Sequence, residues 1–274
     1  MQGHGDYVVL RVGRRFMPAA IVRFLLHRHW LIEPGLETRD APAAVARYAQ
    51  ALQARGVSWV GQRVMVFGYG GNFAVGAELL RLGAAHVVLC DKFAVPNHQA
   101  NARLASHYPQ FLTKQGKTVL PRPQYFTLIH DDIRSPEVQQ TIGSVDLVLS
   151  SSVYEHLNDV EGVTRALVRL TSPGGFHLHF VDLRDHFFKY PFEMLTYPDA
   201  VWQRWLNPSS HLNRLRIWDY ERILSPFFAS LEVQVLSRDE EAFRRAKARI
   251  LPQYLSGDEA RDAVTKILLF GQVP

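Results

Sequence analysis

Residues 64–91 constrain the fold more than any other stretch, because they read as strand, glycine-rich turn, helix and strand in direct succession. Val64–Phe67 is a short apolar run of the kind that forms a strand buried on both faces. Gly68, Gly70 and Gly71 follow at once, and glycine permits a sharp turn and lets a ligand lie against bare backbone. The succession predicts a doubly wound α/β fold with a ligand at the glycine turn.

The rest of this unit indicates which ligand the turn would hold. Asn72 is predicted to cap a helix whose apolar positions recur at helical spacing as far as Gly83. His86–Cys90 reads as a second buried strand, and Asp91 stands at its carboxyl end. A carboxylate at that place accepts hydrogen bonds from ribose hydroxyls. The unit therefore predicts an adenosine-containing ligand.

The spacing of the glycines distinguishes two classes of adenosine ligand. The dinucleotide fingerprint needs Gly or Ala at the sixth position of G-x-G-x-x-G, where this chain has Phe73. The sequence G-Y-G-G-N-F instead resembles motif I of the class I S-adenosylmethionine (SAM)-dependent methyltransferases. That family usually has an acidic residue two positions before the first glycine, and this chain has Val66 there.

Later segments extend the resemblance over roughly residues 63–182. D-I-R at 132–134 is similar to the family motif at the end of the third strand, and D-L-V-L-S…E-H-L…R-L-x-x-P-G-G is similar to motifs IV and V. The resemblance implies an α/β fold with a Rossmann-like, doubly wound, mostly parallel seven-stranded sheet and an antiparallel last strand. N-terminal helices and an insertion after the fifth strand complete the expected architecture.

Two regions are expected along the chain. Residues 1–60 would form an N-terminal helical lid or cap, and residues 61–274 the SAM-binding domain, with a substrate-covering insertion at about 187–215. In the first region, Ala41–Arg55 has apolar positions at helical spacing, and the basic segment Phe16–Trp30 is expected to be a lid or packing helix, or to associate weakly with a membrane surface. The insertion carries aromatic residues that could line an acceptor pocket: Phe187, Phe188, Tyr190, Trp202 and Trp205.

Capping and turn residues predict several local features. Lys114–Pro123 is expected to be a polar, proline-containing connection. Asn158 and Glu161 would form a capping box for a helix that ends at Ser172-Pro-Gly-Gly175. Arg238–Ile250 is expected to be one helix, and Val264–Phe270 the final strand.

The resemblance implies SAM as the cofactor and S-adenosylhomocysteine as its product. Under it, Asp132 accepts a hydrogen bond from the adenine amino group and Ile133 packs on the ring; a helix cap is the alternative role for the aspartate. The candidate cofactor-binding residues lie in the glycine turn and just after three of the strands: Gly68, Tyr69, Gly70, Gly71, Asn72, Asp91, Lys92, Phe93, Asp132, Ile133 and Ser150.

Methyl transfer requires alignment of the acceptor with the sulfonium, and a hydroxyl or ammonium acceptor also needs a base. The candidate catalytic residues are His186, His156 and Asp185, with Asp182 or Asp185 orienting an imidazole. The alternatives are structural. His156 could stabilise its turn, while Asp185 and His186 could cap a helix or anchor the insertion.

No metal site is expected. The alternative is a divalent ion on or near the edge of the sheet where the parallel strands end. Six residues there have oxygen or nitrogen ligand atoms: Glu155, His156, His177, His179, Asp182 and His186. The E-H segment also resembles that of some small-RNA 2′-O-methyltransferases, which use it for a divalent ion. Their pattern needs another glutamate where this chain has Ser152.

Length and composition are those of a globular protein. The chain has 274 residues, 47% of them hydrophobic and 21% charged. A single cysteine, Cys90, excludes an intrachain disulfide, no apolar run approaches the ~20 residues of a membrane span, and the N-terminus lacks a signal-peptide pattern. A cytoplasmic protein is expected. A net charge of +5 is too mild to indicate nucleic acid binding.

The leading functional hypothesis is a SAM-dependent methyltransferase that transfers a methyl group to oxygen or nitrogen of a small or medium-sized acceptor. An NAD-linked oxidoreductase is one alternative, and it rests on the glycine turn and Asp91. A SAM-binding protein without transfer activity is the other, and it rests on Val66.

Overall fold

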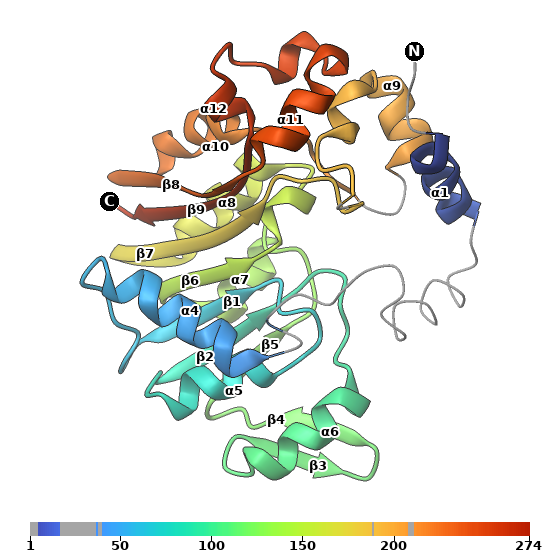
Figure 1. The fold of residues 1–274 in the computed structure, drawn as a ribbon. Helices are drawn as coiled ribbons and strands as arrows, with labels where there is room; N and C mark the ends of the chain where they lie inside the picture. Colours follow the sequence, from blue (N-terminus) through green and yellow to red (C-terminus); the bar gives the residue numbers. More distant parts are fainter. Residues whose placement is uncertain (1–4, 17–36, 38–39, 188, 208–210) are drawn as a thin grey trace.

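A seven-stranded sheet forms the centre of the protein, in the order β5-β2-β1-β6-β7-β9-β8 (Figure 1). The computed structural model describes residues 5–16, 37, 40–187, 189–207 and 211–274. The strands of the sheet are β1 (Arg63–Phe67), β2 (His86–Cys90), β5 (Phe126–Ile129), β6 (Val145–Ser151), β7 (Thr171–Asp182), β8 (Ser230–Arg238) and β9 (Val264–Gln272).

Strand direction agrees with the predicted fold class. β1, β2, β5, β6 and β7 pair in parallel, whereas β9 is antiparallel to both of its neighbours, β7 and β8. From β1 the chain adds β2 and β5 on one side, and then β6 and β7 on the other side. The carboxyl ends of β1 and β6 therefore lie side by side at the point where the strand order reverses. The Rossmann-like sheet with an antiparallel last strand is thereby confirmed, and ligands of such sheets bind at this switch point.

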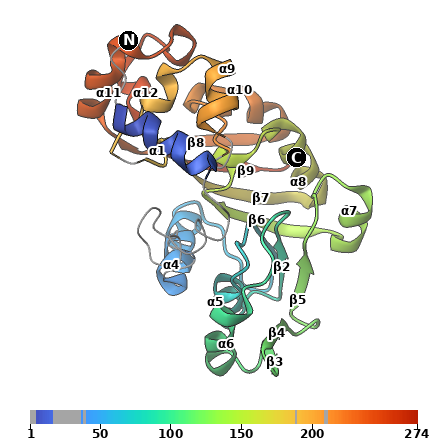
Figure 2. The same ribbon diagram turned by 90° about the vertical axis from the view of Figure 1, so that its right-hand side faces the viewer.

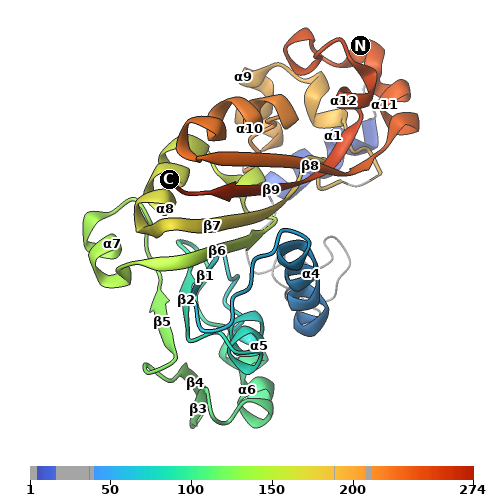
Figure 3. The same ribbon diagram turned by 90° about the vertical axis from the view of Figure 1, so that its left-hand side faces the viewer.

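Helices cover both faces of the sheet. α4 (Ala41–Gln53) and α5 (Ala74–Arg81) lie on one face, and α7 (Pro136–Ile142), α8 (Val160–Leu170) and α10 (Ile217–Leu224) lie on the other (Figures 2 and 3). Each face has its own apolar cluster, because alternate side chains of a buried strand point to opposite sides. Val64–Phe67 of β1 and Val87–Cys90 of β2 are accordingly apolar and buried, as the sequence indicated.

The helix α4 follows its sequence pattern closely. Asp40 Oδ1 accepts a hydrogen bond from Ala43 N at 3.0 Å and caps the first turn. Val45, Tyr48 and Leu52 are all buried, as their spacing predicted. The other N-terminal segment, Phe16–Trp30, lies outside the described residues except for its first residue.

A β-hairpin replaces the expected connection at Lys114–Pro123. β3 (Leu112–Gln115) and β4 (Thr118–Pro121) are antiparallel and pack against α6 (His98–His107). Gly116, with φ of 60°, occupies the first position of the two-residue turn. A glycine there is a hairpin signal that the nearby prolines obscured.

Three local boundaries also differ from expectation. The first turn of α8 is capped by Asp159, whose Oδ1 accepts from Gly162 N at 2.8 Å, and not by Asn158. Phe73 occupies the cap position of α5, while Asn72 Oδ1 accepts from Ala74 N at 2.9 Å. Residues 172–175 belong to β7, because this strand begins directly after α8. The predicted turn there is instead an irregularity in the pairing of β7 with β6, where the register shifts.

The insertion after β7 packs against α1 (Gly5–Phe16), near the N-terminus, and α11 (Glu240–Ala246). Its short helical segments are η2 (Glu193–Thr196), α9 (Asp199–Val201) and η3 (Trp202–Leu206). Apolar side chains of η2 and η3 form one buried cluster with apolar side chains of α1 and α11. The predicted helix over Arg238–Ile250 is divided between α11 and the turn η5 (Lys247–Arg249).

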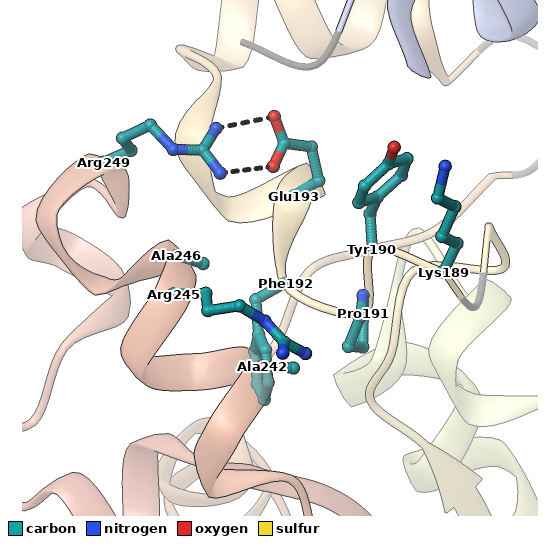
Figure 4. A pocket seen from close by; sticks show the side chains of 9 residues that line it. All are labelled: Lys189, Tyr190, Pro191, Phe192, Glu193, Ala242, Arg245, Ala246 and Arg249. Carbon is teal, nitrogen blue, oxygen red and sulfur yellow. Dashed lines mark hydrogen bonds and ion pairs between the residues drawn. The ribbon is translucent and has the colours of Figure 1, made fainter. Parts of the chain in front are cut away.

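A cavity of about 450 Å³ lies between the insertion and α11 (Figure 4). Two hydrogen bonds join the guanidinium of Arg249 to the carboxylate of Glu193, at 2.7 and 2.8 Å. Lys189 pairs with Asp6 and Arg245 pairs with Glu241, so the cations around this cavity already have counter-charges. Among the described residues, no helix combines the length and the apolar character that crossing a membrane requires.

Candidate cofactor and catalytic site

A cavity of about 380 Å³ opens at the carboxyl ends of β1, β2, β5 and β6, which is the predicted position. This volume is within the usual range for small-molecule sites. Seven of the predicted cofactor residues line it: Gly68, Gly70, Asp91, Lys92, Phe93, Asp132 and Ile133. The opposite wall comes from the segment after β6 and the start of α8, including Ser152, Val153, His156 and Leu157.

The floor of the cavity is a loop that only glycine forms without strain. Gly68, Gly70 and Gly71 have φ values of 77°, 66° and 80°, all in the left-handed region. A Cβ on Gly68 would lie 2.3 Å from Val153 Cγ2, and a Cβ on Gly71 would lie 2.3 Å from the carbonyl oxygen of Val95. The three glycines therefore meet both a conformational and a spatial requirement.

Alanine at Gly71 is expected to destabilise the protein more than alanine at Gly70. Both positions have positive φ, which costs about 1–2 kcal/mol for alanine. A Cβ at Gly70 would have no atom within 4 Å, whereas the one at Gly71 would strike backbone. We expect overpacking to add about 1–3 kcal/mol at Gly71. Urea unfolding of the two variants checks this difference, and equal losses of stability would contradict the structure.

Asp91 ties the glycine loop to the end of β2. Its Oδ2 accepts from Gly70 N at 3.1 Å, and its Oδ1 accepts from Phe93 N and Ala94 N, each at 2.8 Å. An ionised carboxylate has about four acceptor positions, so it can also take hydroxyl donors from a ligand. The side chain of Phe93 is 85% exposed beside it and offers a ring face at the cavity wall.

Asp132 stands on the far side of the cavity in a cluster of charges. Its carboxylate accepts from Arg134 Nη2 at 2.7 Å and from Lys92 Nζ at 3.0 Å. The hydrogen bonds from Arg134 hold the pKa of Asp132 well below its usual range, so the group is ionised at neutral pH. Arg134 also reaches Asp159 Oδ2 at 2.7 Å, which connects this wall to the start of α8.

Four predicted cofactor residues lie next to the cavity without lining it. The ring of Tyr69 is buried and stacks on Phe73, with centroids 6.1 Å apart. Gly71 and Asn72 hold the backbone on the outer side of the loop. Ser150 is buried, and its Oγ lies 2.7 Å from Nδ1 of His179.

Two of the predicted catalytic residues come together. His156 ends the turn η1 (Tyr154–His156) after β6 and lines the cavity, while His186 follows the end of β7. The two imidazole rings contact each other in an edge-to-face arrangement, with their centroids 4.9 Å apart. Ligand atoms of Glu155, His156 and His186 lie within 4.8 Å of one another. The structure therefore brings the two predicted histidines together at the edge of the cavity.

Glu155 is the buried member of this cluster. It is 3% exposed, its Oε1 accepts from Asp182 N at 3.3 Å, and its Oε2 has no hydrogen-bond partner. Burial raises the pKa of this carboxyl to about 8. A carboxyl so far from its usual range beside a cavity is a mark of functional sites.

Asp185 has a structural environment. It is completely buried and accepts hydrogen bonds from Tyr7 Oη and Arg11 Nη2, both on α1. Its Oδ1 also accepts from Phe187 N at 2.8 Å. The prediction that Asp185 orients an imidazole is not supported, because its carboxylate is completely buried and its donors come from α1 and the insertion. Asp182 likewise pairs with Arg184, 2.6 Å away.

His177 and His179 lie inside the sheet, away from the pair at the cavity. His177 Nε2 is 2.8 Å from Thr171 Oγ1, and the two rings contact each other at a centroid distance of 5.4 Å. Burial lowers the pKa of His177 to about 3 and lowers that of His179 as well. Both are therefore neutral core residues.

Residues that sequence patterns did not single out hold the site in place. Asn101, fully buried, donates to Gly71 O at 2.9 Å and accepts from Phe73 N at 3.0 Å, which fixes the glycine loop. Asn213 donates to Tyr154 O at 2.8 Å and to Leu157 O at 3.1 Å, which fixes η1. Neither asparagine belongs to a motif, so only tertiary contacts reveal them.

Comparison with protein families finds one match in this region. Residues 68–179 match the family described as "Methyltransferase domain". The matched segment begins at the first glycine of the loop and ends in β7, so it contains almost every residue of the cavity wall. No curated protein matches the chain.

Solved structures with a similar fold have low sequence identity. A Haemonchus contortus phosphoethanolamine N-methyltransferase 2 is 16% identical with a TM-score of 0.49, and the alignment covers 83% of this chain and 53% of that one. A SAM-dependent methyltransferase from Mesorhizobium loti is 15% identical with a TM-score of 0.44, covering 81% and 96%. The T. thermophilus 16S rRNA N2 G1207 methyltransferase is 12% identical with a TM-score of 0.43, covering 85% and 43%.

Proposed function

We propose an acceptor class and residue roles for this chain on the premise that it is a SAM-dependent methyltransferase, with its methyltransferase domain at residues 68–179. The acceptor is a small or medium-sized molecule that is methylated at oxygen or nitrogen. One observation supports this most directly: the cofactor cavity carries an imidazole, His156, on the wall opposite the glycine loop, backed by His186.

The cofactor is proposed to lie along the cavity from the glycine loop to Asp132. The backbone of Gly68 and Gly70 accommodates the methionine tail, because no side chain projects there. Asp91 accepts hydrogen bonds from the ribose hydroxyls at those acceptor positions of its carboxylate that the backbone N–H groups do not occupy. Asp132 and Ile133 hold the adenine, with the exposed ring of Phe93 beside it. Tyr69, Gly71 and Asn72 support the loop, and Ser150 is assigned to the support of His179.

The reaction is an in-line displacement. The acceptor lone pair forms the new bond to the methyl carbon, the carbon–sulfur bond breaks, and sulfur keeps its electron pair in neutral S-adenosylhomocysteine. Since the sulfonium is already a good leaving group, the protein chiefly orients the acceptor and excludes water. A hydroxyl or ammonium acceptor must also lose a proton, and His156 with His186 assists this loss.

Residues 1–60 are proposed to contribute to the acceptor side of the site. α4 places Arg47 at the carboxyl end of β6, where its Nη2 lies 2.9 Å from Ser151 Oγ. The guanidinium also stacks over Phe180 at 4.0 Å. The insertion at about 187–215 contributes through Asn213, which holds η1, although no described residue of the insertion lines the cofactor cavity.

Replacing His156 with alanine is expected to lower methyl transfer by about a hundredfold, the usual contribution of acid–base assistance. The measurement is transfer of a labelled methyl group from SAM across a panel of hydroxyl and amine acceptors. His107→Ala is the matched control, because His107 is exposed on α6, remote from the cavity.

Two results would count against the proposal. A His156→Ala variant with the wild-type rate would remove the imidazole from the reaction. Wild-type protein that binds SAM but methylates nothing in the panel would favour the binding protein without transfer activity. The match of residues 68–179 to a methyltransferase domain argues against the NAD-linked alternative.

A further inference from the structure

We propose that the outer edge of β5 and the groove beside it bind an extended, acidic segment of a partner protein, which adds to the sheet as one more strand. β5 is the end strand of the seven-stranded sheet, and in the part of the chain that the structure describes it pairs only with β2. The β3–β4 hairpin and α6 project beyond the sheet next to it (Figures 1 and 3). This inference does not depend on methyl transfer, because the groove and the cofactor cavity share no lining residue.

The backbone of β5 has hydrogen-bonding groups that its neighbour leaves free. The carbonyl oxygens of Tyr125 and Ile129 accept hydrogen bonds from backbone N–H groups on the β2 side, at 2.9 and 3.1 Å. Because the backbone groups of successive residues in a strand point to opposite edges, those of Phe126 and Leu128 point outward. The N–H of Phe126 bonds to Arg122 O at 3.0 Å, so an added strand would use the N–H of Leu128 and the carbonyl groups of Phe126 and Leu128. Such an edge is a template for pairing with another chain.

The groove lies directly beside this edge. Its volume is about 630 Å³, and the hairpin and β5 form its walls. The walls are largely apolar and include Leu120, Pro121, Pro123, Phe126 and Leu128. Leu120 is 41% exposed, although it is a large apolar side chain. Since the residues with outward backbone groups also line the groove, an added strand would gain hydrogen bonds and apolar contacts at the same place.

The surroundings of the groove are basic. Residues 92–130, between Asp91 and Asp131, contain no acidic residue, and their cations are Lys92, Arg103, Lys114, Lys117 and Arg122. Of these, only Lys92 forms an ion pair with a described residue. Arg122 lines the groove, and its buried Nε has no hydrogen-bond partner in the described part of the chain. The cations around the cavity beside α11 differ, because they have counter-charges. An acidic residue on the added strand would supply the counter-charge that Arg122 lacks.

These features favour a protein segment over a nucleic acid. A single-stranded nucleic acid binds through aromatic rings on which its bases stack. Among the described residues, the aromatic side chain that lines the groove is Phe126, and it is only 4% exposed. A protein strand instead obtains affinity from backbone hydrogen bonds and specificity from pockets for alternate side chains, and β5 with its groove supplies both.

Selection from a random peptide library displayed on phage tests the site with the full chain as the target. We expect the enriched peptides to alternate apolar and acidic residues. Labelled synthetic copies are then titrated with the wild type and variants while fluorescence anisotropy is recorded. Arg122→Glu should weaken binding at least about tenfold, because it places like charges together. Leu128→Pro should weaken it at least about fivefold, because it removes an outward N–H without breaking the pairing with β2.

The matched control is Arg169→Glu, which reverses an exposed charge on α8 and should bind like the wild type. Thermal unfolding shows which variants are folded, and Leu120→Lys tests the same groove if Leu128→Pro is not. Failure of every enriched peptide to bind the wild type saturably would overturn the site, and so would unchanged binding by folded Arg122→Glu and Leu120→Lys.

Two further measurements address other occupants. Labelled single-stranded RNA that binds more tightly than the peptides, and is lost in Arg122→Glu but kept in Leu128→Pro, would replace the protein partner with a nucleic acid. Sedimentation of the wild type as a dimer that Leu120→Lys converts to a monomer would make a second copy of this chain the occupant. Either result would overturn the proposal of an acidic partner strand.

Discussion

Replacing Asp185 with alanine is expected to lower the free energy of unfolding by about 3–5 kcal/mol, the usual cost of leaving a buried charge without its partner. The ion pair of Asp185 with Arg11 is nearly inaccessible to solvent, with side-chain exposures of 0% and 1%. Tyr7 Oη and Phe187 N lose their acceptor in the same variant. Arg11→Ala should cost about as much, although no sequence motif contains Arg11.

Denaturant unfolding of the two single variants and the double variant measures this coupling. The double variant should lose much less than the sum of the single losses, because neither charge is then left unpaired. Asp258→Ala is a control, since it removes only an exposed helix cap and should cost about 1 kcal/mol. Additive losses, or an unchanged midpoint in Asp185→Ala, would contradict the anchoring role and reopen a catalytic one.

Replacing Asp91 with alanine is expected to reduce SAM affinity by at least about a hundredfold. Hydrogen bonds to a charged group contribute about 1.5–3 kcal/mol each, and the carboxylate would serve the ribose directly. It also holds Gly70 and the turn at Phe93–Ala94, so its removal loosens two walls of the cavity. Equilibrium dialysis or calorimetry with SAM and S-adenosylhomocysteine measures the effect.

Asp40→Ala is the matched control for Asp91→Ala. Asp40 is an exposed helix cap on α4, so its loss should cost some stability and leave SAM affinity unchanged. A folded Asp91→Ala variant whose affinity stays within threefold of the wild type would contradict the proposed ribose contact.

The sequence predicted those parts of the fold that depend on local rules. The glycine loop was predictable because left-handed backbone requires glycine, and the positive φ values of Gly68, Gly70 and Gly71 agree with this. The buried strands around it were predictable because parallel strands covered on both faces are apolar. Asp91 follows from its place at the end of such a strand.

Local rules were weaker where neighbouring residues can do the same task. Asn158 and Asp159 are both good helix caps, and tertiary contacts with Arg134 accompany the use of Asp159. The hairpin at β3–β4 was missed because prolines near its end indicated a connection, while Gly116 carried the turn signal.

The site itself depends on contacts between distant segments. His156 and His186 are 30 positions apart in number, and only the adjacency of β6 and β7 brings their rings together. Asp185, one residue before His186, points to α1 because Tyr7 and Arg11 are buried there. No pattern within the insertion indicates that its aromatic residues pack with α1 and α11.

The most direct test of the central claim is a calorimetric titration of the wild-type chain with SAM and with S-adenosylhomocysteine. If the cavity over Gly68 and Gly70 holds the cofactor between Asp91 and Asp132, both ligands bind saturably with one site per chain. Folded protein that binds neither ligand at high micromolar concentration would contradict the assignment of this cavity.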